Sequence, residues 1–264
     1  MISNSPIETI YFILPLFGFI IGLFGTMLGG GGGFFFLPIL TLLLHVPTQT
    51  AVITSLVATL PIGLVGSVGH FRHKNVDMKV ALMFVVVGVI GAFVGAEITS
   101  RISSEMLKTS FGIYSILIAA NIIRDTYKKK KAETNGECVE LTRKEKIGKT
   151  SFFGFFAGLI TGTFGTSGTA PVLAGLFALR IPIKLVIGTS LLIVSVNTIF
   201  AIGAHFLVGQ IDLTLVGFLT AGSVIGALVG PKLLTKSKVH KSENKARYWY
   251  AIVMVALGIL MIVG

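Results

Sequence analysis

The chain has few charged residues for its size. Asp, Glu, Lys and Arg make up 12% of its 264 positions, whereas hydrophobic residues make up 53% and the mean hydropathy is +0.89. So few charges cannot cover the water-facing surface of a soluble domain. The composition therefore predicts an all-α membrane protein with lipid as its main solvent.

The residues that carry most enzyme chemistry are also scarce. Cys138 is the one cysteine, so the chain has no intramolecular disulfide and no cysteine-based zinc or iron–sulfur site. No two carboxylates have the spacing of a general acid and base, and no His, Asp and Glu cluster has metal-ligand spacing. We therefore expect neither an enzyme nor a bound metal or cofactor.

Basic residues are absent from the beginning of the chain. The start MISNSPIETIYF lacks the basic region of a cleaved signal peptide and runs directly into a long apolar segment, which predicts an uncleaved first helix. The net charge of +11 comes from Lys and Arg between the apolar runs or at their ends. This distribution fits loops that orient a membrane protein, and it argues against nucleic-acid binding.

Ten apolar runs divide into two groups of five. Most have 18 to 24 residues, enough to cross a hydrocarbon layer about 30 Å thick. Two short runs, 33–45 and 168–180, reach only about 20 Å and should stop inside the membrane. Ten passes, or eight passes and two re-entrant pairs, fit equally well. The runs are 7–28, 33–45, 49–70, 78–99, 106–124, 150–165, 168–180, 184–207, 212–234 and 246–263.

A basic stretch without apolar periodicity separates the groups. We read 1–124 and 150–264 as membrane repeats and 125–149 as a cytoplasmic linker. With the linker inside, the basic loop around Arg72 and Lys74 also lies inside, whereas 45–48 and 205–212 contain no Lys or Arg. Both termini are then outside the cell.

The two halves are internally similar. A shift of 135 residues aligns Pro47 with Pro182, Asp77 with Asp212, Thr54-Ser55-Leu56 with Thr189-Ser190-Leu191, and His70-Phe71 with His205-Phe206. Equivalent loops carry opposite charge patterns, so the repeats should be inverted across the membrane. Inverted repeats with broken helices are a recurring transporter plan, although an inert duplicated scaffold would give the same pattern.

Each half contains a glycine-rich interruption. Five consecutive glycines disfavour a helix, so the chain should break there and a short half-helix should follow with its N-terminal amides available to an anion. Tight packing of small residues would explain each break equally well. The candidate substrate-binding residues at the breaks are Gly29, Gly30, Gly31, Gly32 and Gly33, and Gly165, Thr166, Ser167, Gly168 and Thr169.

Other polar residues lie within the apolar runs. Their side chains could bind the substrate or form ordinary bonds between helices: Thr54, Ser55, Thr189, Ser190 and Asn197. His70 and His205 end equivalent segments, where they could couple transport to protons or cap the helices. Glu97 lies near the end of its segment, which favours an interfacial position over a proton relay.

The order of these motifs resembles that of a known family. GGGGGFFFLPIL, TSLVATL, GHFRHKNVD and GAFVGAEI, repeated as TGTFGTSGTAPVL, GTSLLIV, AHFLVGQID and GALVGPKL, resemble the TauE/SafE family of sulfite and organosulfur exporters. The resemblance implies a permease of the cytoplasmic membrane for sulfite or a related small anion, working as a dimer. We expect a secondary transporter that works by alternating access; the alternative is a cation-coupled carrier or a channel for another small solute.

Overall fold

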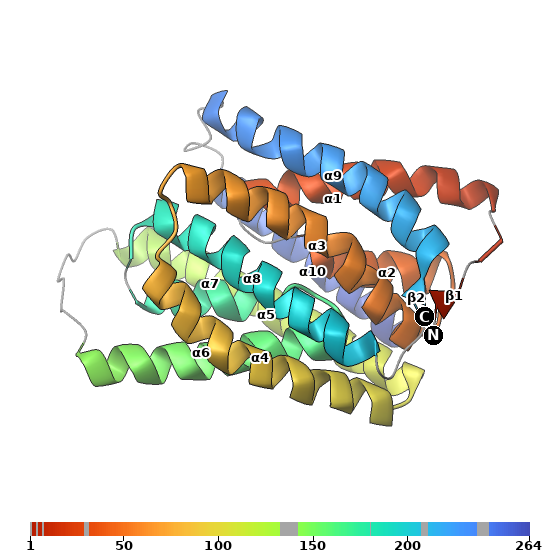
Figure 1. The fold of residues 1–264 in the computed structure, drawn as a ribbon, viewed down its shortest axis with the longest axis horizontal. Coiled ribbons are helices and arrows are strands. Elements are labelled where there is room, and N and C mark those ends of the chain that lie inside the picture. The colour runs from red at the N-terminus through yellow and green to blue at the C-terminus, as the bar shows by residue number, and fades with distance from the viewer. Residues whose placement is uncertain are drawn as a thin grey trace.

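The computed structural model is almost entirely helical (Figure 1). It describes residues 2–3, 5–6, 8–28, 32–132, 142–179, 181–206, 211–236 and 243–264. A parallel pair of two-residue strands, β1 (Ile2–Ser3) and β2 (Ile211–Asp212), joins the beginning of the chain to the start of α9. The helical elements are η1 (Thr9–Ile13), α1 (Leu14–Leu28), η2 (Gly33–Phe35), α2 (Phe36–Pro38), η3 (Ile39–Leu43), α3 (Thr48–Arg72), α4 (Met78–Arg101), α5 (Ser104–Ala132), α6 (Arg143–Phe164), α7 (Thr169–Ala178), α8 (Ile183–Phe206), α9 (Leu213–Lys236) and α10 (Glu243–Val263).

Large apolar side chains cover the outside of the bundle. Leu82, Leu117 and Trp249 are 62%, 63% and 67% exposed, whereas Thr54 and Ser55 are fully buried. Lipid, not water, is the solvent that such a surface fits. Six helical segments in the described part of the chain are long and apolar enough to cross a membrane: Thr9–Thr26, Thr48–Arg72, Met78–Arg101, Ser104–Arg124, Lys184–Phe206 and Leu213–Gly230. Three shorter apolar helices, Gly33–Leu43, Thr169–Ala178 and Tyr248–Val263, accompany them.

α3 and α8 form the centre of the bundle. Buried residues make up 67% of the apolar window of α3 and 61% of that of α8, but only 28% to 44% in the other four spans. Figure 1 shows α1 and α9 on one side of this pair and α4 and α6 on the other, while α5 packs against α10. Residues on the inner faces of α3 and α8 are therefore the ones shielded from lipid on all sides.

Two helix pairs make the same close contacts. Gly22 of α1 lies against the backbone carbonyl of Ser223 in α9, and Gly158 of α6 lies against the carbonyl of Gly88 in α4. Small residues allow helix backbones to approach this closely in a membrane. The matching contacts continue at Gly18 with Leu219 and Gly154 with Phe84, and at Gly226 with Phe19 and Gly91 with Phe155.

The aligned aspartates begin equivalent helices. Asp77 Oδ1 accepts hydrogen bonds from the amides of Lys79 and Val80, both at 3.1 Å, at the start of α4. Asp212 Oδ1 accepts from the amides of Thr214 and Leu215, at 3.0 and 3.2 Å, at the start of α9. An N-terminal carboxylate satisfies helix amides and opposes the positive end of the helix dipole. This shared role gives the alignment of the two halves a structural reason.

The short run 33–45 is less regular than a half-helix. It passes from the 3₁₀ turn η2 through the single turn of α2 into the π-helix η3. Pro38 cannot donate a backbone hydrogen bond, so the α-helical ladder is not continued through it. The corresponding run in the second half, α7, is a regular helix of ten residues.

Helices also extend into the predicted linker 125–149. α5 continues to Ala132 and α6 begins at Arg143, so only residues 133–141, with Cys138, lie outside the described part of the chain. The start of α6 is a capping box, in which Thr142 N donates to Glu145 at 2.8 Å and Glu145 N donates to Thr142 Oγ1 at 3.4 Å. The pattern Thr142-x-x-Glu145 is the sequence signal for this helix start.

We predict that Gly158→Ala destabilises the protein by about 1–3 kcal/mol, because its Cβ would collide with the Gly88 carbonyl and force α6 away from α4. Gly203→Ala in α8 is the matched control, since a Cβ there would meet no atom within 4 Å. Thermal unfolding of the two variants in detergent measures the difference. Equal melting temperatures would contradict the close contact between α4 and α6.

Candidate functional site

Both glycine-rich stretches interrupt the helical path of the chain. α6 ends at Phe164, and Gly165 and Gly168 have φ values of +64° and +54° before α7 begins. In the first half, Gly32 has φ +69° and directly precedes η2. These backbone conformations favour glycine over residues with a side chain. Gly29, Gly30 and Gly31 lie outside the described residues.

The two breaks meet beside α3. A Cβ on Gly33 would lie 2.7 Å from Thr59 Oγ1 and 3.2 Å from the backbone nitrogen of Ser167. Gly165 lies against the carbonyl of Val52, two turns earlier in α3. Val52 and Thr59 are seven residues apart and so lie on one face of that helix. This face of α3 is therefore the surface on which Gly33 and the stretch from Gly165 to Ser167 come together.

Two buried hydroxyl groups at this junction have no hydrogen-bond partner among the described residues. Ser55 lies between Val52 and Thr59 on the same face of α3, and Thr166 belongs to the second break; their exposed fractions are 0% and 3%. An unpartnered hydroxyl at a buried position costs about 1–3 kcal/mol. A ligand that accepts hydrogen bonds would remove this cost.

Aromatic side chains enclose the junction. The ring of Phe34, next to Gly33, lies 5.0 Å from Phe111 of α5, which lies 5.7 Å from Phe164, next to Gly165. Tyr114 stacks on Phe164 at 5.4 Å, and Tyr250 of α10 contacts Phe35 at 5.6 Å. These rings connect the two breaks, and those of Phe34, Phe111 and Phe164 are buried. A hydrogen bond is stronger in such a low-dielectric place.

The last turn of α6 is held by side chains from two other helices. Thr99 Oγ1 donates to the carbonyl of Thr163 at 2.8 Å, and His205 Nε2 lies 2.5 Å from the carbonyl oxygen of Gly162. Gly165 N donates to Thr161 O at 3.1 Å. The carbonyls of Thr161, Gly162 and Thr163 thus have partners, which helps to fix where the helix ends.

The two histidines occupy different environments. His205 is 2% exposed and its Nε2 must carry a proton to donate to Gly162 O. His70 is half-buried at the end of α3, and its Nδ1 has no partner in the described part of the chain. The end of α3 lies beside Gly188 at the start of α8, so the two helices run in opposite directions (Figure 1). Because each histidine is in the last turn of its helix, the two lie at opposite ends of the bundle. Their part in proton coupling stays a prediction.

The other helix-borne candidates separate into two kinds. Thr189 Oγ1 accepts from the amide of Asp77 at 2.9 Å, and Ser190 Oγ donates to Ile187 O at 2.8 Å, so both make bonds within the scaffold. The Thr54 hydroxyl and both side-chain polar atoms of Asn197 have no partner in the described ranges. Asn197 faces α4, where a Cβ on Gly88 would lie 2.7 Å from its amide atoms.

Two residues near these positions were not predicted from the sequence. Thr59 borders Gly33. Its position four residues after Ser55 was a sequence signal that the two side chains lie on the same face of α3, because i and i+4 share a helix face. Thr198 Oγ1 is buried without a partner within the described segments. Thr198 carries no pattern of its own beyond its place next to Asn197.

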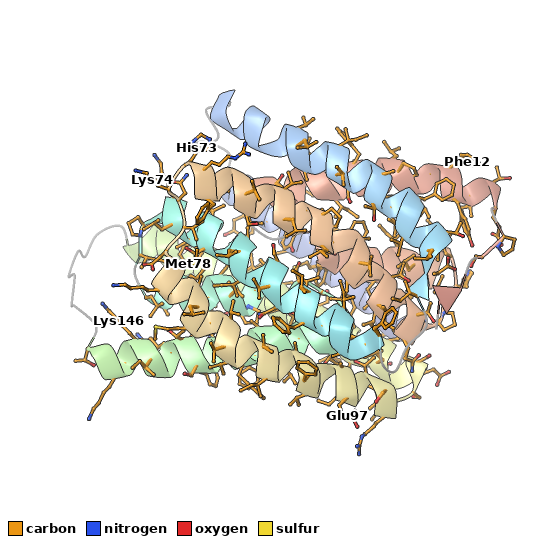
Figure 2. The ribbon with its side chains drawn as sticks, in the orientation of Figure 1. Phe12, His73, Lys74, Met78, Glu97 and Lys146 are labelled. Atoms are coloured by element: carbon orange, nitrogen blue, oxygen red, sulfur yellow. The ribbon has the colours of Figure 1, made fainter. Side chains whose placement is uncertain are left out.

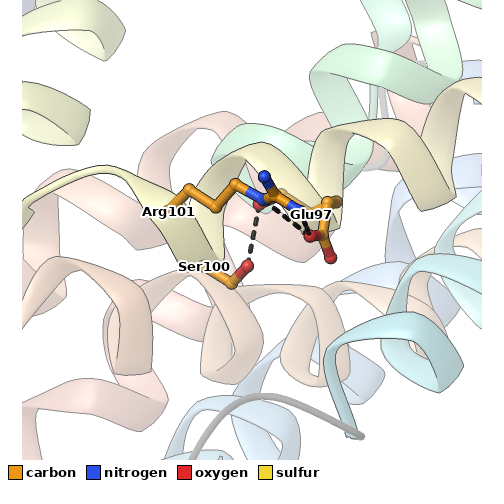
Figure 3. Close-up of polar contacts among 3 residues, drawn as sticks. All are labelled: Glu97, Ser100 and Arg101. Atoms are coloured by element: carbon orange, nitrogen blue, oxygen red, sulfur yellow. Dashed lines mark hydrogen bonds and ion pairs between the residues drawn. The ribbon is translucent and has the colours of Figure 1, made fainter.

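The carboxylate within an apolar run lies at the surface. Figure 3 shows Glu97 in an ion pair with Arg101, one turn later in α4, at 2.6 Å. The two side chains are 54% and 76% exposed, so the pair contributes little to stability. Ser100 Oγ donates to the carbonyl oxygen of Glu97 at 2.8 Å. Glu97 is therefore an end residue of its helix and not part of the junction.

The described residues contain no group of three or more His, Cys, Asp and Glu placed to hold a metal ion.

An apolar groove of about 540 Å³ lies between α3 and α9, away from the glycine breaks. It is lined by Val57, Leu60, Pro61, Leu64, Val65, Val216, Gly217, Thr220 and Ala221. The described part of the junction presents the hydroxyl groups of Ser55 and Thr166, which can donate hydrogen bonds.

Comparison with known proteins identifies relatives over nearly the full length. A family profile described as Sulfite exporter TauE/SafE matches residues 14–261. A probable membrane transporter of Bacillus subtilis (strain 168), YdhB, is 29% identical over 236 residues, which cover 86% of this chain and 94% of the relative. YunE from the same organism is 27% identical over 252 residues, with coverage of 87% and 92%. A probable membrane transporter protein of Xylella fastidiosa (strain 9a5c) is 26% identical over 247 residues, with coverage of 93% and 91%. No solved structure matches the chain significantly.

The contact between Gly33 and Thr59 can be tested by a double-mutant cycle. Gly33→Ala should lower the unfolding free energy by about 1–3 kcal/mol, because its Cβ would crowd Thr59. Thr59→Ala in the same background should restore about 0.5 kcal/mol or more, since it makes room for that Cβ. Thermal unfolding measures both, and Gly69→Ala, with no atom within 4 Å of its Cβ, is the control. Strictly additive effects would show that the first break does not contact α3.

Proposed function

The chain belongs to the TauE/SafE sulfite exporter family, a family of membrane transporters and not of enzymes, and we propose that it carries a small sulfur-containing anion across the cytoplasmic membrane. Sulfite and organosulfonates are the substrates that we infer. The observation that carries this proposal is the junction of the breaks at α3. There the buried, unpartnered hydroxyls of Ser55 and Thr166 provide donors that the described residues do not use.

The junction suits an oxyanion for two reasons. α7 begins at Thr169, directly after the second break, so the positive end of its helix dipole is oriented toward the junction. Hydroxyl donors add to this in a place that the aromatic rings protect from water. Irregular backbone at membrane depth is tolerated where it is buried or lines a ligand site, and the described residues of the breaks, Gly32 with Gly33 and the stretch from Gly165 to Gly168, are buried.

We further infer that the two halves are inverted repeats that move by alternating access. The contact of α1 with α9 repeats that of α6 with α4, at Gly22 with Ser223 and at Gly158 with Gly88. α3 packs against α8, its equivalent in the other half, and α5 packs against its equivalent, α10. A two-fold axis in the membrane plane predicts this set of contacts. Relative movement of the two repeats would then expose the junction to each side in turn.

The distribution of charge supports an orientation with the linker in the cytoplasm. In Figure 2, His73, Lys74 and Lys146 lie at one end of the bundle, and Glu97 lies at the other. Arg72, Lys79 and Lys184 are at the helix ends beside the first group. Basic residues accumulate on the cytoplasmic side of membrane proteins. The repeats 1–124 and 150–264 would each cross the membrane an odd number of times. Both termini would then lie outside the cell.

Transport in proteoliposomes tests the function. We expect labelled sulfite or a sulfonate to enter faster than into empty vesicles, and Ser55→Ala and Thr166→Val to lower kcat/KM about tenfold or more, the effect of losing one hydrogen bond to a charged group. Neither variant should lower the melting temperature, because neither hydroxyl has a partner among the described residues.

The matched control is Ser115→Ala. Ser115 Oγ donates to Met254 O at 2.6 Å between α5 and α10, so this variant should lose stability but keep its transport rate. The proposal fails if no sulfur anion moves faster than in empty vesicles. It also fails if Ser55→Ala and Thr166→Val both transport at the wild-type rate.

Labelling of Cys138 tests the orientation. Since this is the one cysteine, an impermeant maleimide should react with it only after the cytoplasmic face has been opened. Glu8 is exposed near the beginning of the chain, so Glu8→Cys in a Cys138→Ser background should react in intact cells. Labelling of wild-type Cys138 from outside would reverse the orientation.

A further inference from the structure

The donors at the junction of the breaks are neutral. We propose that this site accepts anions with a single negative charge and excludes dianions, so that hydrogen sulfite and simple sulfonates are carried whereas sulfate and the sulfite dianion are not. The inference rests on the proposed function and specifies its substrate class. It is based on two observations. The hydroxyls of Ser55 and Thr166 have no partner, and no basic side chain lies around them, among the described residues.

The described basic side chains of these helices lie at the ends of the helices or of their apolar spans. On α3 and α4 they are Arg72, Lys79 and Arg101, and on α5 they are Lys108 and Arg124. At the start of α6, Lys149 Nζ donates to the carbonyl of Ala178, the last residue of α7, at 3.5 Å. That contact is at the opposite end of α7 from the junction. A guanidinium or ammonium group therefore does not reach the breaks from these elements.

Three titratable groups surround the junction more closely. His205 of α8 is held at the carbonyl of Gly162, which uses its Nε2 proton. Tyr114 of α5 and Tyr250 of α10 contact Phe164 and Phe35. A phenol with an ordinary pKa of about 10 is neutral at physiological pH. The carboxylates of α4, Asp77 and Glu97, lie at its two ends. No full charge from these elements, positive or negative, therefore lies beside an anion bound at the junction.

The charge of the ligand then decides whether it can enter. The cost of removing an ion from water rises with the square of its charge, so a dianion loses about four times as much hydration energy as a monoanion of similar size. The start of α7 supplies about half of a positive charge, and Pro171 in its first turn has no amide to donate. This partial charge and two hydroxyls can compensate one negative charge far better than two.

The chemistry of sulfur oxyanions provides the test. Sulfite takes up its first proton near neutral pH, so the ratio of monoanion to dianion changes across the physiological range. Methanesulfonate is a monoanion throughout this range, and sulfate is a dianion throughout. All three present three oxygens on one face of a sulfur atom, and the change of sulfite flux with pH varies the charge of one and the same anion.

The experiment measures initial uptake of the three anions into proteoliposomes containing the full chain between pH 6 and pH 9, with the internal pH held constant. Above the pKa of hydrogen sulfite, sulfite flux at fixed total concentration should fall about tenfold for each pH unit, in step with the hydrogen sulfite fraction. Methanesulfonate flux should change less than about twofold. Sulfate should not enter faster than into empty vesicles. A titration of His205 would change sulfite and methanesulfonate fluxes alike, so the second anion controls for it.

The outcomes separate the inference from the function on which it rests. Sulfate flux comparable to that of methanesulfonate, or sulfite flux that rises with pH, would overturn the selection of monoanions while leaving a sulfur-anion transporter. If none of the three anions moved faster than in empty vesicles, the proposed function itself would be wrong, and this inference with it.

Discussion

The contact of two interrupted backbones on one face of α3 is the constraint on which the rest of the structure depends. Gly33 can approach Thr59 and Ser167 only because it has no Cβ, and Gly165 can approach the Val52 carbonyl for the same reason. With side chains at these positions, the two breaks would be separated and water or lipid would have to solvate them. Glycine therefore allows both the irregular backbone conformation and the close packing that buries it.

The surrounding helices can be understood as support for that contact. Thr99 and His205 satisfy the carbonyls at the end of α6, and the aromatic rings from Phe34 to Phe164 close the space between the breaks. The glycine contacts of α1 with α9 and of α4 with α6 bring the outer helices close to the centre. Hydroxyls without a partner among the described residues remain where this scaffold is most enclosed. Buried polar groups without partners destabilise a protein, so a ligand is the simplest reason for them.

Much of this arrangement follows from local patterns in the sequence. The apolar runs locate the helices, and the glycine stretches locate the breaks, because chain length in a bilayer and the helix penalty of glycine are local properties. The alignment of Asp77 with Asp212 correctly pairs two helix starts. The irregular course through Pro38 was not predicted, although proline is itself a local signal. The helix start at Thr142 also had a signal, in the capping box with Glu145.

Partners across the fold were harder to predict. Thr54 and Thr189 occupy the same place in the Thr-Ser motif of the two halves, yet Thr189 accepts from the amide of Asp77 whereas the Thr54 hydroxyl has no partner among the residues described. The difference arises from which neighbouring element packs against each helix, and a single sequence does not contain that information. Thr59 illustrates the same limit, since its role depends on the approach of Gly33 from another segment.

The central claim is that an anion binds where the two breaks meet. A cryo-electron microscopy structure of the protein with methanesulfonate bound tests it most directly. Density for the sulfonate in contact with the Ser55 and Thr166 hydroxyls, between Gly33 and Gly165, is the result that we expect. Density at another place, or both glycine stretches wound into continuous helix with no ligand between them, would contradict the account.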